Sequence, residues 1–382
     1  MIIGKIKIYR IKLPFSMEFS HSLRKRFSTD NIVVEVVGEN GEIAGYGEGA
    51  PRSYVTGESQ RSALEAVGYF IRQKTFPWEL NDVNQIWKLI DSLPRGKGYN
   101  AAICALEMSL LDAIAKKEKR PVTDYFSKDF YAPKIHYGGV VPLAHKKRVK
   151  ELCVLTKKME INKLRLKIGK DFEQNREMFE TVKSVFGNDC DLRVDVNGAW
   201  DHKCGIKHVP LLQNYGVKVV EQPFMPHDKD ISKFARFIKT RGLSLMADES
   251  ACTLDDVEHI LQEGLYEMVN IRLSKCGGFR NSIKMINYMR ENGLSFQIGC
   301  QLGESGLLSS AGRSLSLLCS DALYYDGSYD KFLLKENITS EDVSFGLGGE
   351  AGPVKGIGLG VDINNGNLLH MSKDSPEELI RA

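Results

Sequence analysis

Residues 192–200 read LRVDVNGAW, and this short stretch decides how the rest of the chain is assigned. Leu192, Val194 and Val196 alternate with other residues, as they do in a buried strand. Asp195 and Asn197 stand where a strand of the core should stay apolar. A carboxylate and an amide at the end of such a strand suggest that the strand delivers polar groups to a site.

Seven other β-rich runs resemble this one, and they alternate with amphipathic helical stretches from about residue 135 onward. The eight runs are KIHYGGVV (134–141), KLRLKIG (163–169), DLRVDVNG (191–198), GVKVVEQP (216–223), GLSLMADES (242–250), YEMVNIRLS (266–274), GLSFQIGC (293–300) and the weaker ALYYDGS (322–328). Eight such units in series predict a parallel (β/α)8 barrel of class α/β over residues 131–330.

The region before the barrel has a different pattern. Residues 1–130 predict a strand pair at 3–13 and 31–50 with a turn at 39–41, followed by helices within 58–75 and 100–120. This is a small α+β unit. The tail, 331–382, lacks a strand–helix rhythm, and its glycine-rich stretch 346–360 favours a loop over a phosphate-binding motif. We expect the tail to return to the N-terminal unit and complete it.

Composition narrows the class of partner. The formal net charge of +3 over 382 residues lacks the basic excess of a nucleic-acid binder, so a small molecule is the expected partner. No apolar run is long enough to cross a bilayer, and the N-terminus alternates like a strand. The eight cysteines are scattered without metal-binding spacing and are expected to be reduced. These features favour a soluble cytoplasmic protein that binds neither membranes nor nucleic acid.

Five ionisable residues end successive apolar runs. They are Lys167, Asp195, Glu221, Asp248 and Lys275, spaced by 28, 26, 27 and 27 residues, or about one βα unit each. In a (β/α)8 barrel all these strand ends lie on the C-terminal face, where such enzymes hold their active sites. The spacing therefore predicts that five side chains far apart in sequence meet in one pocket.

Three convergent carboxylates repel one another and are costly to desolvate unless a cation neutralises them. Oxygen ligands without His or Cys favour a hard ion such as Mg²⁺, which keeps open positions for substrate oxygens. A lysine beside a dication is biased toward the neutral amine, which is a competent general base. The pattern thus predicts a metal at Asp195, Glu221 and Asp248, with Lys167 and Lys275 as bases.

Each residue taken alone has a simpler structural explanation. Asp195 is also suited to a turn or a helix N-cap, Glu221 to a strand end before Pro223, and the two lysines to snorkelling toward solvent. The stretch from Asp248 through Glu249 is equally suited to capping the next helix. The conjunction favours a site, because five unrelated coincidences would have to fall on equivalent positions of consecutive units.

At this point the sequence resembles a known family. The motifs RLKIG, DVNGAW, EQP, ADES and NIRLSKCGG are similar to those of the muconate-lactonizing subgroup of the enolase superfamily, which includes the dipeptide epimerases. GYGEGAPRSYVTGES at 45–59 resembles the specificity loop of that family's α+β capping domain, and GIGLGVDI at 356–363 its closing segment. The resemblance spans nearly the whole chain.

The resemblance implies an activity and a set of site residues. Mg²⁺ would be held by the three carboxylates, and the two lysines would stand on opposite faces of a small carboxylate substrate and move its α-proton through an enediolate. Arg165 takes the first position of the family's K-x-K pair, where lysine is more usual. Asn197 and Glu249 are expected at the substrate. The resemblance also implies a homo-oligomer.

Two departures bear on the substrate. Dipeptide epimerases of the family often carry D-x-D on the last barrel strand to hold an ammonium, whereas this chain has Tyr324-Tyr325-Asp326, which keeps one carboxylate. On the seventh strand, Cys300 fits the family motif, and Glu304 fits its acidic position after a one-residue shift. Tyr324, Asp326, Cys300 and Glu304 are thus candidate substrate-binding residues. Loss of one carboxylate predicts bulky or hydrophobic dipeptides, or N-acyl amino acids without an ammonium.

Several alternatives stay open at this stage. A cycloisomerase or a syn-dehydratase uses the same lysine pair, so the epimerase or racemase is only the first choice. A mandelate racemase type would carry an H-x-D dyad, and a metal-dependent hydrolase usually has His ligands at the strand ends; neither is present here. A non-catalytic metal-binding barrel would not need both lysines. The basic run at 24–26 is either a lid over an anionic substrate or, more commonly, a solvated charge run.

Overall fold

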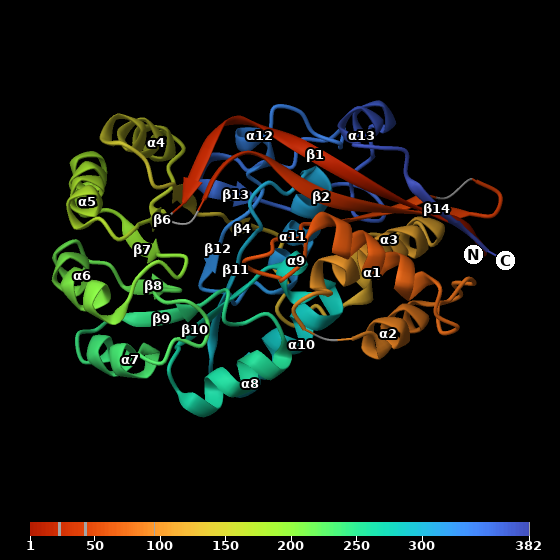
Figure 1. The fold of residues 1–382 in the computed structure, drawn as a ribbon. Coiled ribbons are helices and arrows are strands. Elements are labelled where there is room, and N and C mark those ends of the chain that lie inside the picture. The colour runs from red at the N-terminus through yellow and green to blue at the C-terminus, as the bar shows by residue number, and fades with distance from the viewer. Residues whose placement is uncertain (22–23, 42–43, 95, 382) are drawn as a thin grey trace.

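The computed structural model describes residues 1–381 except 22–23, 42–43 and 95. Its centre is an eight-stranded parallel sheet in chain order, which curls into the predicted barrel (Figure 1). The strands are β5 (Gly139–Val141), β6 (Lys163–Lys167), β7 (Asp191–Asp195), β8 (Val219–Glu221), β9 (Ser244–Ala247), β10 (Met268–Ile271), β11 (Ser295–Ile298) and β12 (Tyr324–Tyr325). The N–H of Gly138 donates to the carbonyl of Tyr325 at 2.8 Å, so the first and last strands meet.

Helices follow the strands and cover the outside of the sheet (Figure 1). They are α4 (Lys146–Lys158), α5 (Phe172–Phe186), α6 (His202–Asn214), α7 (Ile231–Lys239), α8 (Leu254–Glu263), α9 (Leu273–Cys276), α10 (Gly278–Glu291), α11 (Gly306–Leu318) and the four-residue α12 (Asp330–Leu333). Leu164 and Leu166 of β6 and Val194 of β7 lie in an apolar cluster with residues of these helices. Apolar strand residues therefore face outward, which leaves the alternate positions to the barrel interior.

The N-terminal region forms an antiparallel sheet in the order β14-β1-β2-β3, covered by helices. The elements are β1 (Ile3–His21), β2 (Arg24–Gly38), β3 (Ala44–Gly49), α1 (Gln60–Ile71), α2 (Val83–Ser92), α3 (Asn100–Lys117) and, from the tail, β14 (Glu377–Ile380). A Cβ at Gly47 would lie 2.1 Å from the carbonyl of Ala105, so the glycines of β3 let α3 pack directly on the strand. The sequence did not predict α2 or β14.

The tail crosses back over both parts of the molecule. It contains η2 (Leu347–Gly349), β13 (Glu350–Ala351) and α13 (Asn365–Met371), and β13 pairs with β4 (Ile135–His136) while β14 pairs with β1. The short η1 (Val122–Tyr125) follows α3. The pairing of β14 with β1 supports a capping unit made of 1–130 and 331–382, and these boundaries stay a prediction.

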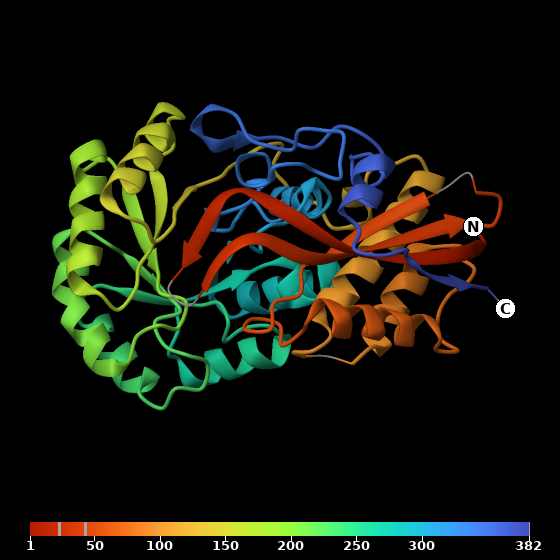
Figure 2. The same ribbon diagram turned by 45° about the horizontal axis from the view of Figure 1, so that its top comes forward.

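The long β1–β2 hairpin reaches from the capping unit across the barrel (Figures 1 and 2), and both chain termini lie at the far end of that unit. Of the basic run at 24–26, the side chains of Arg24 and Lys25 lie outside the described residues. The guanidinium of Arg26 lies 5.6 Å from the ring centroid of Tyr54. In the described part of the chain, no helix is both long and apolar enough to span a membrane.

Candidate active site

The five predicted residues lie together at the C-terminal end of the barrel. Lys167, Asp195 and Glu221 are the last residues of β6, β7 and β8. They lie side by side on neighbouring strands, because Lys167 is paired with Asp195 and Asp195 is paired with Glu221. Asp248 directly follows β9. Lys275 is not at a strand end as predicted, because it lies in α9, four residues beyond β10.

Each lysine contacts one end of this row of carboxylates. Lys167 Nζ lies 2.7 Å from Asp195 Oδ2 and donates to Asn197 Oδ1 at 2.9 Å. Lys275 Nζ lies 3.0 Å from Asp248 Oδ1 and also donates to the Asp248 carbonyl. Strands β6 and β10 are four steps apart in a barrel of eight, so the two lysines approach the row from opposite sides.

An arginine that the sequence analysis did not single out lies among the carboxylates. Arg272 forms ion pairs with Asp248 and, at 3.6 Å, with Glu221, and its Nη1 donates to Gln301 at 3.0 Å. Asn270, two residues earlier in β10, donates to Glu221 Oε1 at 2.7 Å. The two-residue spacing between Asn270 and Arg272 could have predicted both contacts, because residues that face the barrel interior recur at every second position of a strand.

The three carboxylates form an oxygen donor set that is wholly removed from solvent. Burial and the charges of Asp195 and Asp248 raise the pKa of Glu221, so negative charge is crowded at this point. In the part of the chain that the structure describes, no three acidic, His or Cys side chains are arranged to hold one ion as they stand. Arg272 contacts two of the three carboxylates. The chemistry of the donors fits a hard dication that would compete with Arg272.

Burial and neighbouring charges together determine the protonation of the ionisable groups in and beside the carboxylate row. Burial opposes ionisation of Asp195, but Lys167 and Arg165 outweigh it and lower the pKa of Asp195 to about 2. Burial likewise lowers the pKa of Lys275, but the charge of Asp248 outweighs it, so the net shift is upward. Burial and the charge of Asp248 raise the pKa of Glu249 to about 8. Both the ammonium of Lys275 and the protonated form of Glu249 are therefore favoured near neutral pH in the arrangement seen here.

A cavity of about 370 Å³ opens above this row. Among the predicted residues, the lining includes Arg165, Lys167, Asn197, Glu249, Cys300 and Glu304. Asn197 links two of them, because it accepts from Lys167 and its Nδ2 donates to Glu249 Oε1 at 3.2 Å. Glu304 accepts from the backbone N–H of Gln301 at 2.6 Å, and burial raises its pKa to about 8. Lys275 does not line the cavity, since it lies behind Asp248 with a fully buried side chain.

The two predicted residues of the last strand lie elsewhere. Asp326 is buried beneath the cavity, where it pairs with Arg193 at 2.6 Å and with Arg165 at 3.2 Å. Its carboxylate is thus already neutralised by this chain. Tyr324 lies deeper, in an apolar cluster with Val219 and Met246. This position does not support the prediction that Tyr324 binds substrate, because its hydroxyl lies 3.5 Å from Asp191, at the start of β7, and its side chain is not among those that line the cavity.

The capping unit holds the loop that follows β11. Asn31 Nδ2 donates to the Gly303 carbonyl at 2.9 Å, and Arg52 Nη2 donates to the Leu302 carbonyl at 2.6 Å. Glu48 accepts from the N–H groups of Ser305 and Leu308, at the start of α11. This loop carries Cys300 and Glu304, so residues from β2, β3 and the following segment fix one wall of the cavity.

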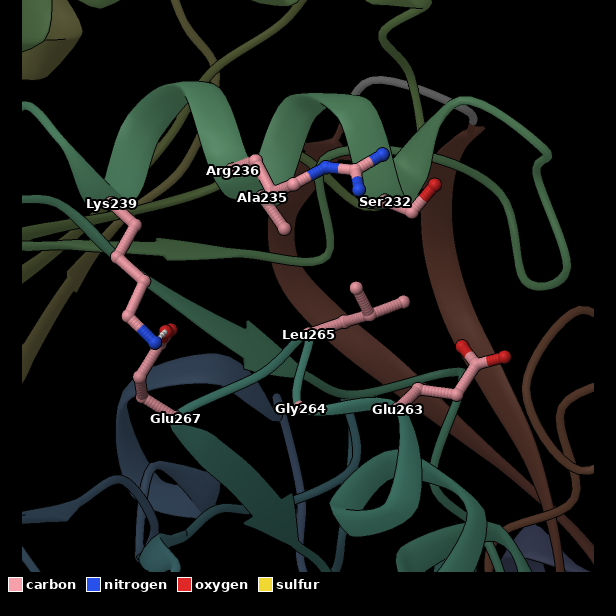
Figure 3. A pocket seen from close by; sticks show the side chains of 8 residues that line it. All are labelled: Ser232, Ala235, Arg236, Lys239, Glu263, Gly264, Leu265 and Glu267. Carbon is pink, nitrogen blue, oxygen red and sulfur yellow. Dashed lines mark ion pairs between the residues drawn. The ribbon is translucent and has the colours of Figure 1, made fainter.

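A second hollow of about 360 Å³ lies on the outside of the barrel (Figure 3). It is lined by Ser232, Ala235, Arg236, Lys239, Glu263, Gly264, Leu265 and Glu267. Lys239 and Glu267 approach each other there at 4.0 Å; the Lys239 side chain is largely exposed and that of Glu267 is partly exposed. Glu267 immediately precedes β10, so this hollow adjoins the N-terminal end of the strands, away from the carboxylate row.

Comparison with known proteins identifies relatives that are similar to most of the chain. A hydrophobic dipeptide epimerase from Enterococcus faecalis is 24% identical over 375 residues, 98% of either chain. An N-succinyl-L-Arg/Lys racemase from Bacillus cereus is 26% identical over 315 residues, which cover 82% of this chain and 83% of the racemase.

A similar fold occurs in the crystal structure of the E. faecalis dipeptide epimerase complexed with Mg and the dipeptide L-Leu-L-Tyr. The two structures have a TM-score of 0.81 at 23% identity, over 95% of this chain and the whole of the other. The profile of the family described as enolase C-terminal domain-like matches residues 147–367, more than half of the chain and most of the barrel with its strand-end residues. The chain therefore belongs to the enolase C-terminal domain-like family, as its motifs indicated.

Proposed function

We propose that this protein is an Mg²⁺-dependent racemase or epimerase that moves the proton α to a carboxylate in a dipeptide or an N-acyl amino acid. One observation carries the proposal: Lys167 and Lys275 contact the two ends of one carboxylate row from opposite sides of the barrel. Two bases on opposite faces of a substrate allow one to remove a proton and the other to return one, which inverts the stereocentre.

Asp195, Glu221 and Asp248 would hold the ion. Bound Mg²⁺ would stabilise the negative charge that develops on the substrate carboxylate as the α-proton leaves. The chain itself orients Lys167, through Asp195 and Asn197. Lys275 would reach the substrate once its contact with Asp248 loosens. Arg165 forms an ion pair with Glu221 at 3.2 Å and so holds this carboxylate in place. A guanidinium stays protonated, so Arg165 adds positive charge beside the carboxylates without acting as a base.

The substrate class rests on the relatives and on the last barrel strand. The named relatives act on hydrophobic dipeptides and on N-succinyl-Arg/Lys, both of them amino acids acylated at nitrogen. Asp326 is neutralised by Arg165 and Arg193, so it offers no free carboxylate for an ammonium near the reacting centre. This supports substrates whose reacting residue has an amide nitrogen. Homo-oligomer formation and a cytoplasmic location stay predictions from the sequence.

The test is deuterium incorporation from D₂O at the α-carbon, measured by NMR over a panel of dipeptides and N-acetyl amino acids with added Mg²⁺. We expect exchange with inversion for at least one member and none after chelation. Lys163→Ala is the matched control, because Lys163 begins the same strand that Lys167 ends and is exposed. Exchange that persists undiminished in the chelated enzyme, or retention of configuration throughout the panel, would contradict the proposal.

A further inference from the structure

Arg272 is the cation that reaches the cavity from the side of β10. It directly follows that strand and is one of the residues that line the cavity. Lys275, on the same side, lies behind Asp248 and does not line the cavity. Only 7% of Arg272 is exposed, so its guanidinium lies almost wholly out of bulk solvent. A ligand that enters the cavity therefore meets Arg272 before Lys275 on this side.

The carboxylates that Arg272 contacts already have other cations. Arg272 pairs with Asp248 and, at 3.6 Å, with Glu221. Asp248 also pairs with Lys275 at 3.0 Å. Glu221 also pairs with Arg165 at 3.2 Å. Both carboxylates thus keep a cationic partner when Arg272 moves away.

The other two cations are also held by groups outside the carboxylate row. Arg165 Nε pairs with Asp326 at 3.2 Å, and Lys275 Nζ donates to two backbone carbonyls. Arg272 has one such bond, from Nη1 to Gln301 Oε1 at 3.0 Å. Its Nε is buried without a hydrogen-bond partner among the residues that the structure describes. Since arginine carries five N–H groups, Arg272 keeps donors that this arrangement does not use.

Once the carboxylate row holds a dication, Arg272 loses its present partners. A guanidinium stays protonated, so Arg272 cannot avoid the cost of an unpaired buried charge by losing a proton. Repulsion between the guanidinium and the dication adds to this cost. An anion in the cavity would remove it. Under the proposed function that anion is the carboxylate of the substrate.

The shape and position of Arg272 suit a carboxylate. The planar guanidinium can donate two parallel N–H···O bonds to the two oxygens of one carboxylate. Arg272 follows β10 and Lys167 ends β6, four steps apart in a barrel of eight, and both line the cavity. A substrate whose carboxylate contacts Arg272 therefore extends across the cavity toward Lys167.

We propose that Arg272 is a substrate-binding residue that changes partners. It neutralises Asp248 and Glu221 in the metal-free protein, and it binds the carboxylate of the substrate once the row holds its ion. This inference rests on the proposed function and deepens it, because it assigns a residue to the substrate carboxylate. Removal of the guanidinium has two effects of opposite sign: the metal loses a competitor, whereas the substrate loses a partner.

Calorimetry on the full-length protein would measure both effects. The first titration adds MgCl₂ to the metal-free protein. The second, at saturating Mg²⁺, compares N-acetyl-L-leucine with N-acetyl-L-leucinamide and L-Ala-L-Leu with its C-terminal amide, so that the members of each pair differ only in the carboxylate. We expect the unmodified protein to bind the acid of at least one pair about tenfold or more tightly than the amide.

Arg272→Gln should bind Mg²⁺ about tenfold or more tightly, because a competing charge is gone, and should lose most of the preference for the acid. Arg272→Lys keeps the charge without the planar fork, so we expect nearly unchanged Mg²⁺ binding and an intermediate preference. General damage to the site would weaken both kinds of binding in both variants, which separates a structural role from the proposed one.

Arg290→Gln is the matched control. Arg290 also pairs with a carboxylate, that of Asp321 at 2.6 Å, but it lies in α10 and does not line the cavity. Both titrations should change less than about twofold in this variant. Circular dichroism would establish that each variant folds.

A measurement on the unmodified protein keeps the test decisive if Arg272→Gln does not fold. The NMR signal of Arg272 Nε–H, assigned by its loss in Arg272→Lys, should shift on addition of MgCl₂ and again on addition of the acid, but not of the amide. Three results would overturn the inference: Mg²⁺ binding by Arg272→Gln that is unchanged or weaker, a preference for the acid that survives in that variant, or no preference in the unmodified protein.

The proposed function fails separately, because binding needs no turnover. The two opposite effects without deuterium exchange would refute the racemase assignment and leave the role of Arg272 standing. Exchange with inversion, together with an undiminished preference for the acid in Arg272→Gln, would do the reverse.

Discussion

The barrel interior has two layers of opposite character. The lower layer is the apolar cluster of Val219, Met246, Met268 and Tyr324. The upper layer, two residues further along the same four strands, is Glu221, Asp248, Asn270 and Asp326. All four upper residues are fully or almost fully buried, yet each is held by ion pairs or hydrogen bonds.

Two residues further along each of these strands, the inward-facing side chain is therefore polar and belongs to the site, whereas the earlier one is apolar and belongs to the core. Side chains at i and i+2 share the inward face, so each strand supplies one packing residue and one polar residue to the same column. In the hollow near the N-terminal strand ends, the ion pair between Lys239 and Glu267 is partly open to solvent. Buried charge gathers at the other end, where a substrate can enter.

The largest expected effect comes from the upper layer. Asp248→Asn should lower kcat/KM by about 10³-fold or more, because it removes a metal ligand and with it the stabilisation of the developing charge. Met246→Leu, two residues earlier on the same strand, should change kcat/KM little, since the apolar volume is nearly kept. Steady-state kinetics and Mg²⁺ titration would measure both. Full activity in Asp248→Asn would remove Asp248 from the site.

A second effect concerns stability. Asp326→Asn should lower the free energy of unfolding by about 3 kcal/mol, because it leaves Arg193 as a buried charge without its partner. Asp321→Asn breaks an ion pair with Arg290 nearer the surface and should cost about 1 kcal/mol or less. Urea denaturation would compare the two. Equal losses would contradict the view that the upper layer depends on internal charge pairing.

The stability effect of Asp326 should also depend on pH. Burial raises its pKa, but Arg193 and Arg165 outweigh burial, so the pKa falls below its ordinary value of 3.8. The stabilisation is thus fully present above the unfolded-state pKa and is lost as the pH falls through the lower folded-state pKa. The difference between wild type and Asp326→Asn should narrow in denaturation curves taken below about pH 4. A difference that grows on acidification would reverse the assigned sign.

The smallest expected effect comes from the lower layer. Tyr324→Phe keeps the ring in the apolar cluster and removes only a hydroxyl 3.5 Å from Asp191. It should change kcat/KM by less than about twofold for free-amine and N-acylated substrates alike. Competition assays with both substrate types would detect a change in preference. A tenfold shift between them would place Tyr324 back at the substrate.

The sequence predicted the barrel and the carboxylate row because both rest on repeated local patterns. The five ionisable residues recur every 26 to 28 residues, about one βα unit each, and Lys167, Asp195 and Glu221 end their strands as expected. Lys275 contacts the carboxylate row as expected, but it lies in the short helix α9 and not at a strand end. The sequence RLSKCGG is compatible with either a strand end or a short helix.

The errors came from contacts between segments distant in sequence. Arg272 and Arg193 were passed over, since a positive residue in a strand says nothing of the acid that it will meet across the barrel. Tyr324 was assigned by family alignment, and the choice between it and Asp326 depends on which residue lies higher in the barrel. β14 was missed because four residues, EELI, become a strand only when β1 supplies the partner edge.

The central claim is that two lysines act on opposite faces of one substrate. The most direct measurement is α-proton exchange in D₂O for each enantiomer of an active substrate, in Lys167→Ala and in Lys275→Ala. Each variant should lose inversion, with a rate loss of about 10² to 10⁴, and should still exchange one enantiomer only, the opposite one in each variant. Undiminished exchange of both enantiomers in either variant would contradict the two-face arrangement.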